Sequence, residues 1–230
     1  MIATGFILLT AVIAIILVLG VRATARRAFA DQAQQNKVVL RAVAVLAIWL
    51  VFITVMSVTG FYNSTAMPPR VPLFLVFPAF AFTGFFFLSG RNRQLITAVP
   101  AHWPVYFQSF RIAVELLLLG LAVKGMIPKE ASFEGYNFDV VIGITAPLVG
   151  WLAYTRKAIS NMVLRLWNIA GFCTLAIVVF IFISHAYYPQ VWHKQESIIS
   201  QGFGLFPYTY LAGFLMPAAV FMHVLSLKKI

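Results

Sequence analysis

The sequence predicts an all-α polytopic membrane protein, folded as one bundle of seven transmembrane helices. Of its 230 residues, 62% are hydrophobic and only 10% are charged, whereas a soluble domain carries about 25% charged residues. Several apolar runs reach the roughly 20 residues that a helix needs to cross a ~30 Å hydrocarbon core. The formal net charge of +11 arises from Lys and Arg at the ends of these runs. Membrane topology accounts for that placement, so we expect a lipid bilayer and no nucleic acid as partner.

Each apolar run is predicted to be a helix, because a spanning segment must satisfy its own backbone hydrogen bonds and no run alternates as a barrel strand does. The connectors are short and polar, except for 186–207, which is predicted to form a small cap or an interfacial helix. The spans, which together make a single domain over 1–230, are predicted at 2–20, 38–61, 71–90, 104–126, 138–155, 162–185 and 208–227.

The first run is interpreted as a retained span. Small residues at 23–25 resemble a signal-peptide cleavage site. However, the run lacks a basic segment before it, is longer than a signal-peptide core, and ends among Arg22, Arg26 and Arg27. This order of charges is that of a span whose C-terminal end lies in the cytoplasm.

The distribution of basic residues predicts an outer N-terminus and a cytoplasmic C-terminus. In this orientation twelve Lys and Arg residues lie at cytoplasmic ends and four at outer ends, while Arg111 lies inside a run. Such a bias follows the positive-inside rule. The acidic residues show the opposite trend, with only Asp31 inside. Those predicted outside are Glu130, Glu134, Asp139 and Glu196.

A weak internal repeat is also predicted. Spans two and six both open with Val-Leu-Arg, at 39–41 and 163–165, and spans three and seven carry central prolines, Pro78 and Pro217. This pattern predicts a 3+1+3 pseudo-repeat, in which span four joins two parallel three-helix units. Parallel repeats of this kind occur among transporters.

Three polar residues in span four form the first candidate site. Gln108, Arg111 and Glu115 share one helical face. At 1.5 Å per residue from Pro104, Arg111 lies about 10 Å deep and Glu115 about 16 Å deep. A charge at the bilayer centre costs about 2.5–3.5 kcal/mol, so an Arg–Glu pair there is a functional-site hypothesis that faces protein or water.

Three interpretations of this pair remain open. In a functional centre, Arg111 binds an anion or holds Glu115, while Glu115 takes up and releases a proton. In a structural lock, the pair only joins helices. If the span begins near Ile112 instead, Arg111 snorkels to the cytoplasmic headgroups and Glu115 is its interfacial partner.

A second candidate site is "FEGYNFD", residues 133–139, where span five begins. Asn137 can cap this helix, and Asp139 suits its positive first turn. Alternatively, Glu134 and Asp139 form an acidic rim that attracts a cation or a basic ligand. Two carboxylates also resemble an acid/base pair, although nothing places a scissile bond between them.

The histidines and the cysteine predict no metal and no cofactor. Among His102, His185, His193 and His223, the closest pair is eight residues apart, and no HxxxH spacing of two ligands on one helix face occurs. We expect His102 and His223 near the inner face and His185 hydrogen-bonded at an outer helix end. The single cysteine, Cys173, excludes an internal disulfide or thiolate cage. The last span has no lysine for a retinal Schiff base, and GxSxG and phosphate-loop motifs do not occur.

Four segments, "QSFRIAVELLL", "FEGYNFDVVIGITAP", "LRLWNIAGFC" and "FPYTYLAGFLMPAAVFMHVLSL", resemble a family of uncharacterised bacterial multi-pass membrane proteins. The resemblance covers roughly residues 100–230. It implies only a bacterial inner-membrane setting and does not point to any activity, substrate or cofactor. Together with His185, the family-like positions are the candidate ligand-binding residues. They are Gln108, Arg111, Glu115, Glu134, Asn137, Asp139, Trp167 and Asn168.

Three functions are therefore considered. The first is a small-solute or ion transporter, or a related ligand-binding membrane protein, centred on Arg111 and Glu115; it needs a polar route towards the midplane. The second is a membrane-embedded enzyme acting on a lipid or quinone, with Glu134, Asp139 and His185 or His193 converging on one pocket. The third is a non-catalytic partner or assembly protein, which predicts a filled bundle without a continuous cavity. We favour the first, which is not an enzyme.

Overall fold

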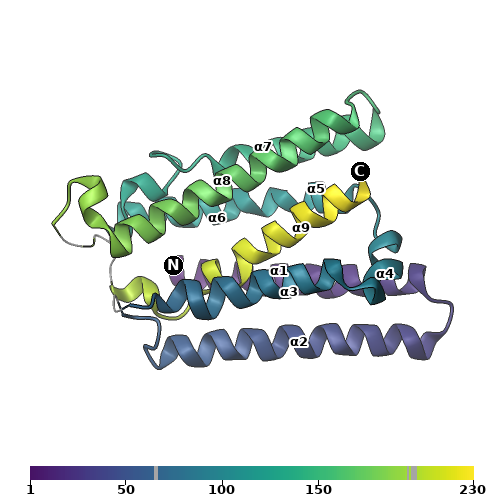
Figure 1. Cartoon of the computed structure of the whole chain (residues 1–230), viewed down its shortest axis with the longest axis horizontal. Coiled ribbons are helices and arrows are strands. Elements are labelled where there is room, and N and C mark those ends of the chain that lie inside the picture. The colour runs from purple at the N-terminus through teal and green to yellow at the C-terminus, as the bar shows by residue number, and fades with distance from the viewer. Residues whose placement is uncertain (65–66, 196, 198–200) are drawn as a thin grey trace.

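The computed structural model describes residues 1–64, 67–195, 197 and 201–230, and all regular secondary structure in these ranges is helical. The longer helices are α1 (Ile2–Ala28), α2 (Gln32–Val58), α3 (Phe77–Leu88), α6 (Arg111–Val123), α7 (Asp139–Gly150), α8 (Asn161–Tyr187) and α9 (Met216–Lys229). The shorter ones are α4 (Arg93–Ala98), α5 (Trp103–Phe107) and the π-helices η1 (Pro72–Val76), η5 (Trp151–Thr155) and η8 (Leu211–Leu215). Single 3₁₀ turns are η2 (Gly90–Asn92), η3 (Gln108–Phe110), η4 (Lys129–Ala131), η6 (Pro189–Trp192) and η7 (Gln201–Gly204). Figure 1 shows the long helices lying side by side, with consecutive ones running in opposite directions.

Several of these helices have the length and composition of membrane spans, which confirms the predicted class. Five are long and apolar enough to cross a bilayer, or six if the pair Pro72–Leu88 and Gly90–Ala98, bent by 71°, counts as one span. The five are Ile2–Ala28, Gln32–Val58, Trp103–Val123, Asn161–Tyr187 and Leu211–Lys229. The remaining apolar helix, Asp139–Thr155, is shorter. Its α part has 12 residues and its π part 5, about 25 Å at 1.5 Å per residue. The seventh span stays a prediction.

Local sequence sets the helix boundaries, which fall within a few residues of those predicted except at the α1–α2 turn. There α1 continues to Ala28 and α2 already begins at Gln32. The side chain of Asp31 accepts hydrogen bonds from the backbone N–H groups of Ala33 and Gln34, both at 3.1 Å, and so caps α2. Ser160 caps α8 in the same way, through the backbone N–H of Val163.

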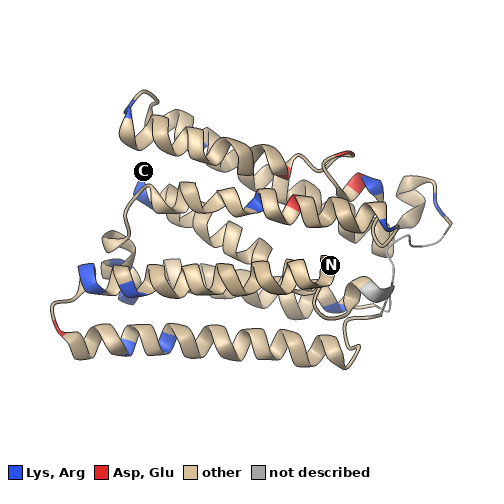
Figure 2. Cartoon of the chain, turned by 180° about the vertical axis from the view of Figure 1, so that it is seen from behind, with Lys and Arg blue, Asp and Glu red and all other residues tan. Residues whose placement is uncertain are grey.

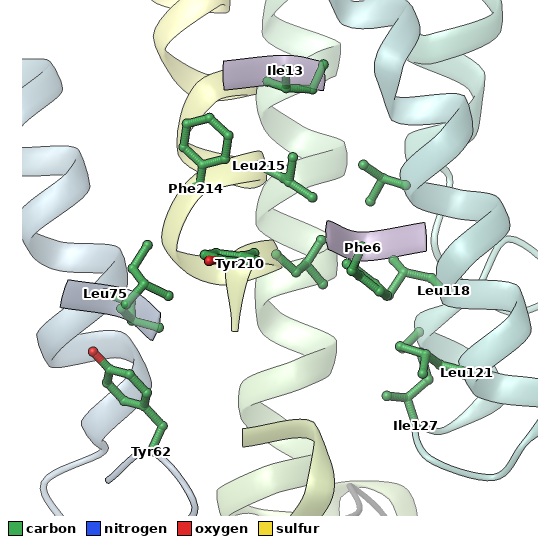
Figure 3. Close-up of a cluster of buried hydrophobic side chains, with 14 of the residues drawn as sticks. Phe6, Ile13, Tyr62, Leu75, Leu118, Leu121, Ile127, Tyr210, Phe214 and Leu215 are labelled. Atoms are coloured by element: carbon green, nitrogen blue, oxygen red, sulfur yellow. The ribbon is translucent and has the colours of Figure 1, made fainter. Parts of the chain in front are cut away.

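The hydrophobic core lies where α1, α6 and η8 meet. Phe6 of α1 packs beside Leu118 and Leu121 of α6, with Phe214 and Leu215 of η8 on the other side (Figure 3). All five side chains are buried. By contrast, α2 lies at the edge of the bundle (Figure 1) and exposes large apolar side chains, as expected of a helix that faces lipid. These are Leu40, Ile48, Val51, Val55 and Val58.

Prolines explain the irregular turns in spans three and seven. Proline lacks a backbone N–H, and its ring pushes away the carbonyl four residues earlier, so a wider π turn precedes both Pro78 and Pro217. The carbonyl that Pro217 leaves free is that of Gly213, which accepts a hydrogen bond at 2.8 Å from Trp49 Nε1 of α2. The edge helix α2 therefore completes the backbone bonding of η8.

Replacing Trp49 with phenylalanine is expected to lower the free energy of unfolding by about 1–3 kcal/mol, because a buried carbonyl oxygen then has no donor. Unfolding by SDS titration from mild detergent micelles measures this change. Trp151→Phe is the matched control, since Trp151 is 40% exposed and its indole N–H makes no hydrogen bond within the described residues. Equal losses for the two variants would contradict the role of the indole N–H.

Charge is distributed unequally along the bundle. Figure 2 shows Lys and Arg concentrated at the end that holds the C-terminus, where α1 ends with Arg26 and Arg27 and α9 with Lys228 and Lys229. In the connector predicted at 186–207, α8 continues to Tyr187, and the described residues beyond it form the 3₁₀ turns η6 and η7 as their only helices. Glu196, predicted to lie outside, is not among the described residues.

Candidate functional site

Arg111 and Asp139 form a buried ion pair at the centre of the site. Arg111 begins α6 and Asp139 begins α7, and they are 1% and 4% exposed. Arg111 Nε donates to Asp139 Oδ2 at 2.7 Å, while Nη2 contacts Oδ1. The predicted i, i+4 pairing of Arg111 with Glu115 is wrong. Asp139, on the neighbouring helix α7, contacts the planar guanidinium with both carboxylate oxygens. Glu115, one turn along the same helix as Arg111, makes no such contact.

The remaining donors of Arg111 extend the cluster to α8 and α9. Nη1 lies 2.9 Å from His223 Nε2, and Nη2 donates to Thr174 Oγ1 at 2.9 Å. Because guanidinium only donates, His223 Nε2 must accept, and Nδ1 carries the ring hydrogen. That hydrogen is donated to Asn168 Oδ1 at 2.9 Å, and Asn168 Nδ2 in turn donates to the Leu164 carbonyl at 2.8 Å. His223, expected apart from the site near the inner face, therefore belongs to it.

Glu115 lies one turn further along α6 and is 1% exposed. Its Oε2 accepts a hydrogen bond at 2.7 Å from Asn137 Nδ2, which also donates to the Ala131 carbonyl at 3.1 Å. Asn137 Oδ1 accepts from the backbone N–H of Asp139 at 2.9 Å. Asn137 therefore bonds the first residue of α7, although the N-cap position itself is Phe138 and not Asn137 as predicted. All of the amide's functional atoms are thus engaged, and Asn137 is fixed in orientation. In contrast, Glu115 Oε1 has no hydrogen-bond partner in the part of the chain that the structure describes.

Two further predicted residues flank the cluster. Gln108 is fully buried and donates from Nε2 to the Ala219 carbonyl at 3.0 Å, while its Oε1 has no partner among the described residues. Trp167 Nε1 donates to Thr145 Oγ1 at 3.0 Å, and its ring lies 5.6 Å from that of His223. Both side chains therefore border the polar centre without contributing a charge.

Glu134 lies apart from the cluster. It is an exposed loop residue that pairs with Lys129 at 3.5 Å. The predicted acidic rim of Glu134 and Asp139 is therefore not formed, because Asp139 is buried against Arg111.

His185 also lies apart. Its Nδ1 donates to the Ile181 carbonyl at 2.9 Å, and its ring stacks on Trp192 at 4.3 Å. Its Nε2 is 3.8 Å from Glu130 Oε2 and has no hydrogen-bond partner within the described ranges. His185 thus lies in the last turn of α8, hydrogen-bonded at a helix end.

A cavity of about 520 Å³ connects the polar centre with the loops at the opposite end from the C-terminus. Arg111, Glu115 and Asp139 line it at one end, and Tyr62 and Gly204 at the other. Its walls come from η1, α8 and η8 and are largely apolar. They include Pro72, Val76, Val179, Phe182, Ile183, Leu211, Ala212 and Leu215. The arrangement suits a molecule with an apolar body and one polar group.

Tyr62 supplies a second polar group to this cavity. It lies in the turn after α2, and its hydroxyl has no partner among the residues that the structure describes. Burial raises the pKa of Tyr62 to about 12. The phenol is therefore neutral at physiological pH, and its O–H is available to donate a hydrogen bond.

His223 and Thr174 are the site residues that sequence reasoning missed. His223 lies five residues before the basic pair Lys228 and Lys229, about 8 Å along the helix at 1.5 Å per residue. Arg111 lies about 10 Å from Pro104, where span four is predicted to begin. This similar distance from the basic ends of two spans is the signal in the sequence that could have paired the two residues.

Within the described residues, no three His, Cys, Asp or Glu side chains are grouped as a metal site. The chain matches no known protein family, no curated protein and no solved structure.

Proposed function

We propose that this chain is a seven-span membrane protein that binds a small, largely apolar solute in the cavity above Arg111 and Glu115, and transports it. The cavity carries this proposal, because it joins the loop end of the bundle to buried charged groups. Intramembrane ionisable residues that face a cavity mark solute pathways in membrane proteins. Pockets of this volume, apolar with a few polar groups, are typical of small-molecule sites.

We further propose a bacterial inner membrane location with an outer N-terminus. The concentration of Lys and Arg at the end that holds the C-terminus (Figure 2) supports this orientation. In this arrangement Asp139–Thr155 is the seventh span and the cavity opens outwards. The shared π turns before Pro78 and Pro217 support the pseudo-repeat of spans three and seven.

The geometry favours this function over the two alternatives. An enzyme using Glu134, Asp139 and His185 needs them in one pocket, but only Asp139 lines the cavity. A purely structural partner needs no cavity beside its central charges.

Transport also requires a route onwards to the cytoplasm. Gln108 Oε1 and Ser226 Oγ, buried without partners in the described part of the chain, lie on that side of the Arg111 cluster and support one.

Cysteine labelling tests the proposal. In a Cys173→Ala background, Ala212→Cys places one thiol on the cavity wall, and a membrane-impermeant methanethiosulfonate reagent is added from the outer side. We expect labelling of Ala212→Cys and slower labelling when Val179→Trp fills the cavity. Ala176→Cys, on the exposed face of α8, is the matched control and should not react. Absence of labelling in a folded Ala212→Cys protein, or labelling only from the cytoplasmic side, would refute outward access.

The same assay separates transport from binding alone. Ser226→Cys is expected to react with reagent added from the cytoplasmic side. A protein that only binds its ligand would leave this thiol unlabelled.

A further inference from the structure

Resting on the proposed function, we infer that the ligand is an organic cation, an amine or quaternary ammonium with an apolar body, whose charged head lies at Glu115. The inference follows from which charges at the polar end of the cavity are compensated and which are not.

Arg111 does not provide an anion site. Its Nε, Nη1 and Nη2 atoms are all bonded to protein, and its charge is balanced by both oxygens of Asp139. An anionic head would have to displace Asp139 from this buried, bidentate pair, which would leave a carboxylate without a partner.

Glu115 is the uncompensated group. Its carboxylate is 1% exposed, lines the cavity, and makes one hydrogen bond to the neutral side chain of Asn137. Oε1 has no partner among the described residues. His223 is held as the neutral tautomer by Arg111 and Asn168. With Arg111 positively charged, Asp139 and Glu115 negatively charged and His223 neutral, the cluster has a net charge of −1. A bound cation neutralises this charge.

The walls suit an organic cation better than a hydrated inorganic ion. Aromatic rings line the cavity from Phe110 near the polar end to Phe182, Phe203 and Tyr208. Ring faces attract ammonium groups, and the aliphatic walls of η1 and η8 bury an apolar body. A bare metal ion would find only one carboxylate that is not already paired with Arg111, and no group of three metal-binding side chains in the described residues.

Matched probes test the inference. We use 4-phenylbutyl-trimethylammonium and its neutral isostere, in which carbon replaces the quaternary nitrogen. Protection of Ala212→Cys from labelling is measured in the Cys173→Ala background, and binding to the purified protein is measured by calorimetry. The ammonium probe has no N–H to donate, so its advantage comes from charge attraction to Glu115 and to the aromatic rings. It is expected to bind about 10- to 100-fold more tightly than the isostere, the lower end of the range for a close charge pair.

Glu115→Gln should remove this preference, so that the ammonium probe and the isostere bind with equal affinity. The amide oxygen of glutamine still accepts from Asn137, so the fold is kept. Glu134→Gln, which removes an exposed carboxylate already paired with Lys129, is the matched control and should keep the preference.

Equal affinity for both probes, or an ammonium preference that survives in Glu115→Gln, would overturn the inference. If Ala212→Cys labels from outside but the ammonium protects no better than the isostere, only the ligand class is wrong. If Ala212→Cys does not label at all, the proposed function itself fails.

Discussion

Replacing Arg111 with leucine is expected to lower the free energy of unfolding by about 3–5 kcal/mol. The variant leaves the carboxylate of Asp139 buried and unpaired, and breaking a buried ion pair from one side carries a cost of this size. The His223 ring also loses its donor. SDS titration from mild detergent, followed by circular dichroism, measures the change.

The double variant Arg111→Leu/Asp139→Leu distinguishes an unpaired charge from lost packing. It is expected to recover most of the stability, because replacing both partners of a buried pair by apolar side chains is often neutral or stabilising. Lys129→Leu breaks the exposed pair with Glu134 and should change stability by only about 0–1 kcal/mol. A double variant no more stable than Arg111→Leu would show that the charge of Asp139 is not the cause.

Gly171→Ala is expected to lower the free energy of unfolding by about 1–3 kcal/mol, the usual cost of overpacking. Gly171 lies on α8 against the ring of His223, and a Cβ atom there would fall on ring atoms Cε1 and Nε2. His223 must then move away from Arg111, so the hydrogen bond between them is lost as well. Thermal unfolding in detergent, with the fluorescence of the nearby Trp167, reports both effects.

The matched control for this variant is Gly84→Ala. A Cβ at Gly84 of α3 meets no atom within 4 Å, and alanine is favoured over glycine in a helix by about 1 kcal/mol. This variant is therefore expected to be neutral or slightly more stable. If both alanine variants behave alike, the close approach of α8 to His223 does not constrain the site.

Span positions were predictable from the sequence because they depend on local composition. An apolar run must be helical in a bilayer, so Asn161–Tyr187 was located to within two residues of the predicted 162–185. The π turns before Pro78 and Pro217 were not predictable, because how a helix absorbs a proline depends on its neighbours. Only the fold shows that Trp49 replaces the donor missing at Gly213.

Part of the polar site was predictable, but Thr174, His223 and the pairing of the residues were not. Arg111 was marked because a charge is costly in an apolar segment. Asp139 was marked as an acidic residue at the start of a helix, and Asn168 only because its segment resembles a family of bacterial multi-pass membrane proteins. Which of them meet depends on how α6, α7, α8 and α9 cross, and a single sequence carries no such information. The i, i+4 rule gave Arg111 the wrong partner because it describes one isolated helix.

The hydrogen bonds of the Arg111 cluster all run in fixed directions. Arg111 donates to His223, His223 donates to Asn168, and Asn168 donates to Leu164. Both ring nitrogens of His223 and both oxygens of Asp139 are engaged, so beyond Glu115 no acceptor in the described cluster is vacant. The opposite charges of Arg111 and Asp139 therefore stabilise each other without any transfer of a proton between the helices. We therefore expect the cluster to relay no protons between the helices, and a proton that enters from the cavity to reach no further than Glu115.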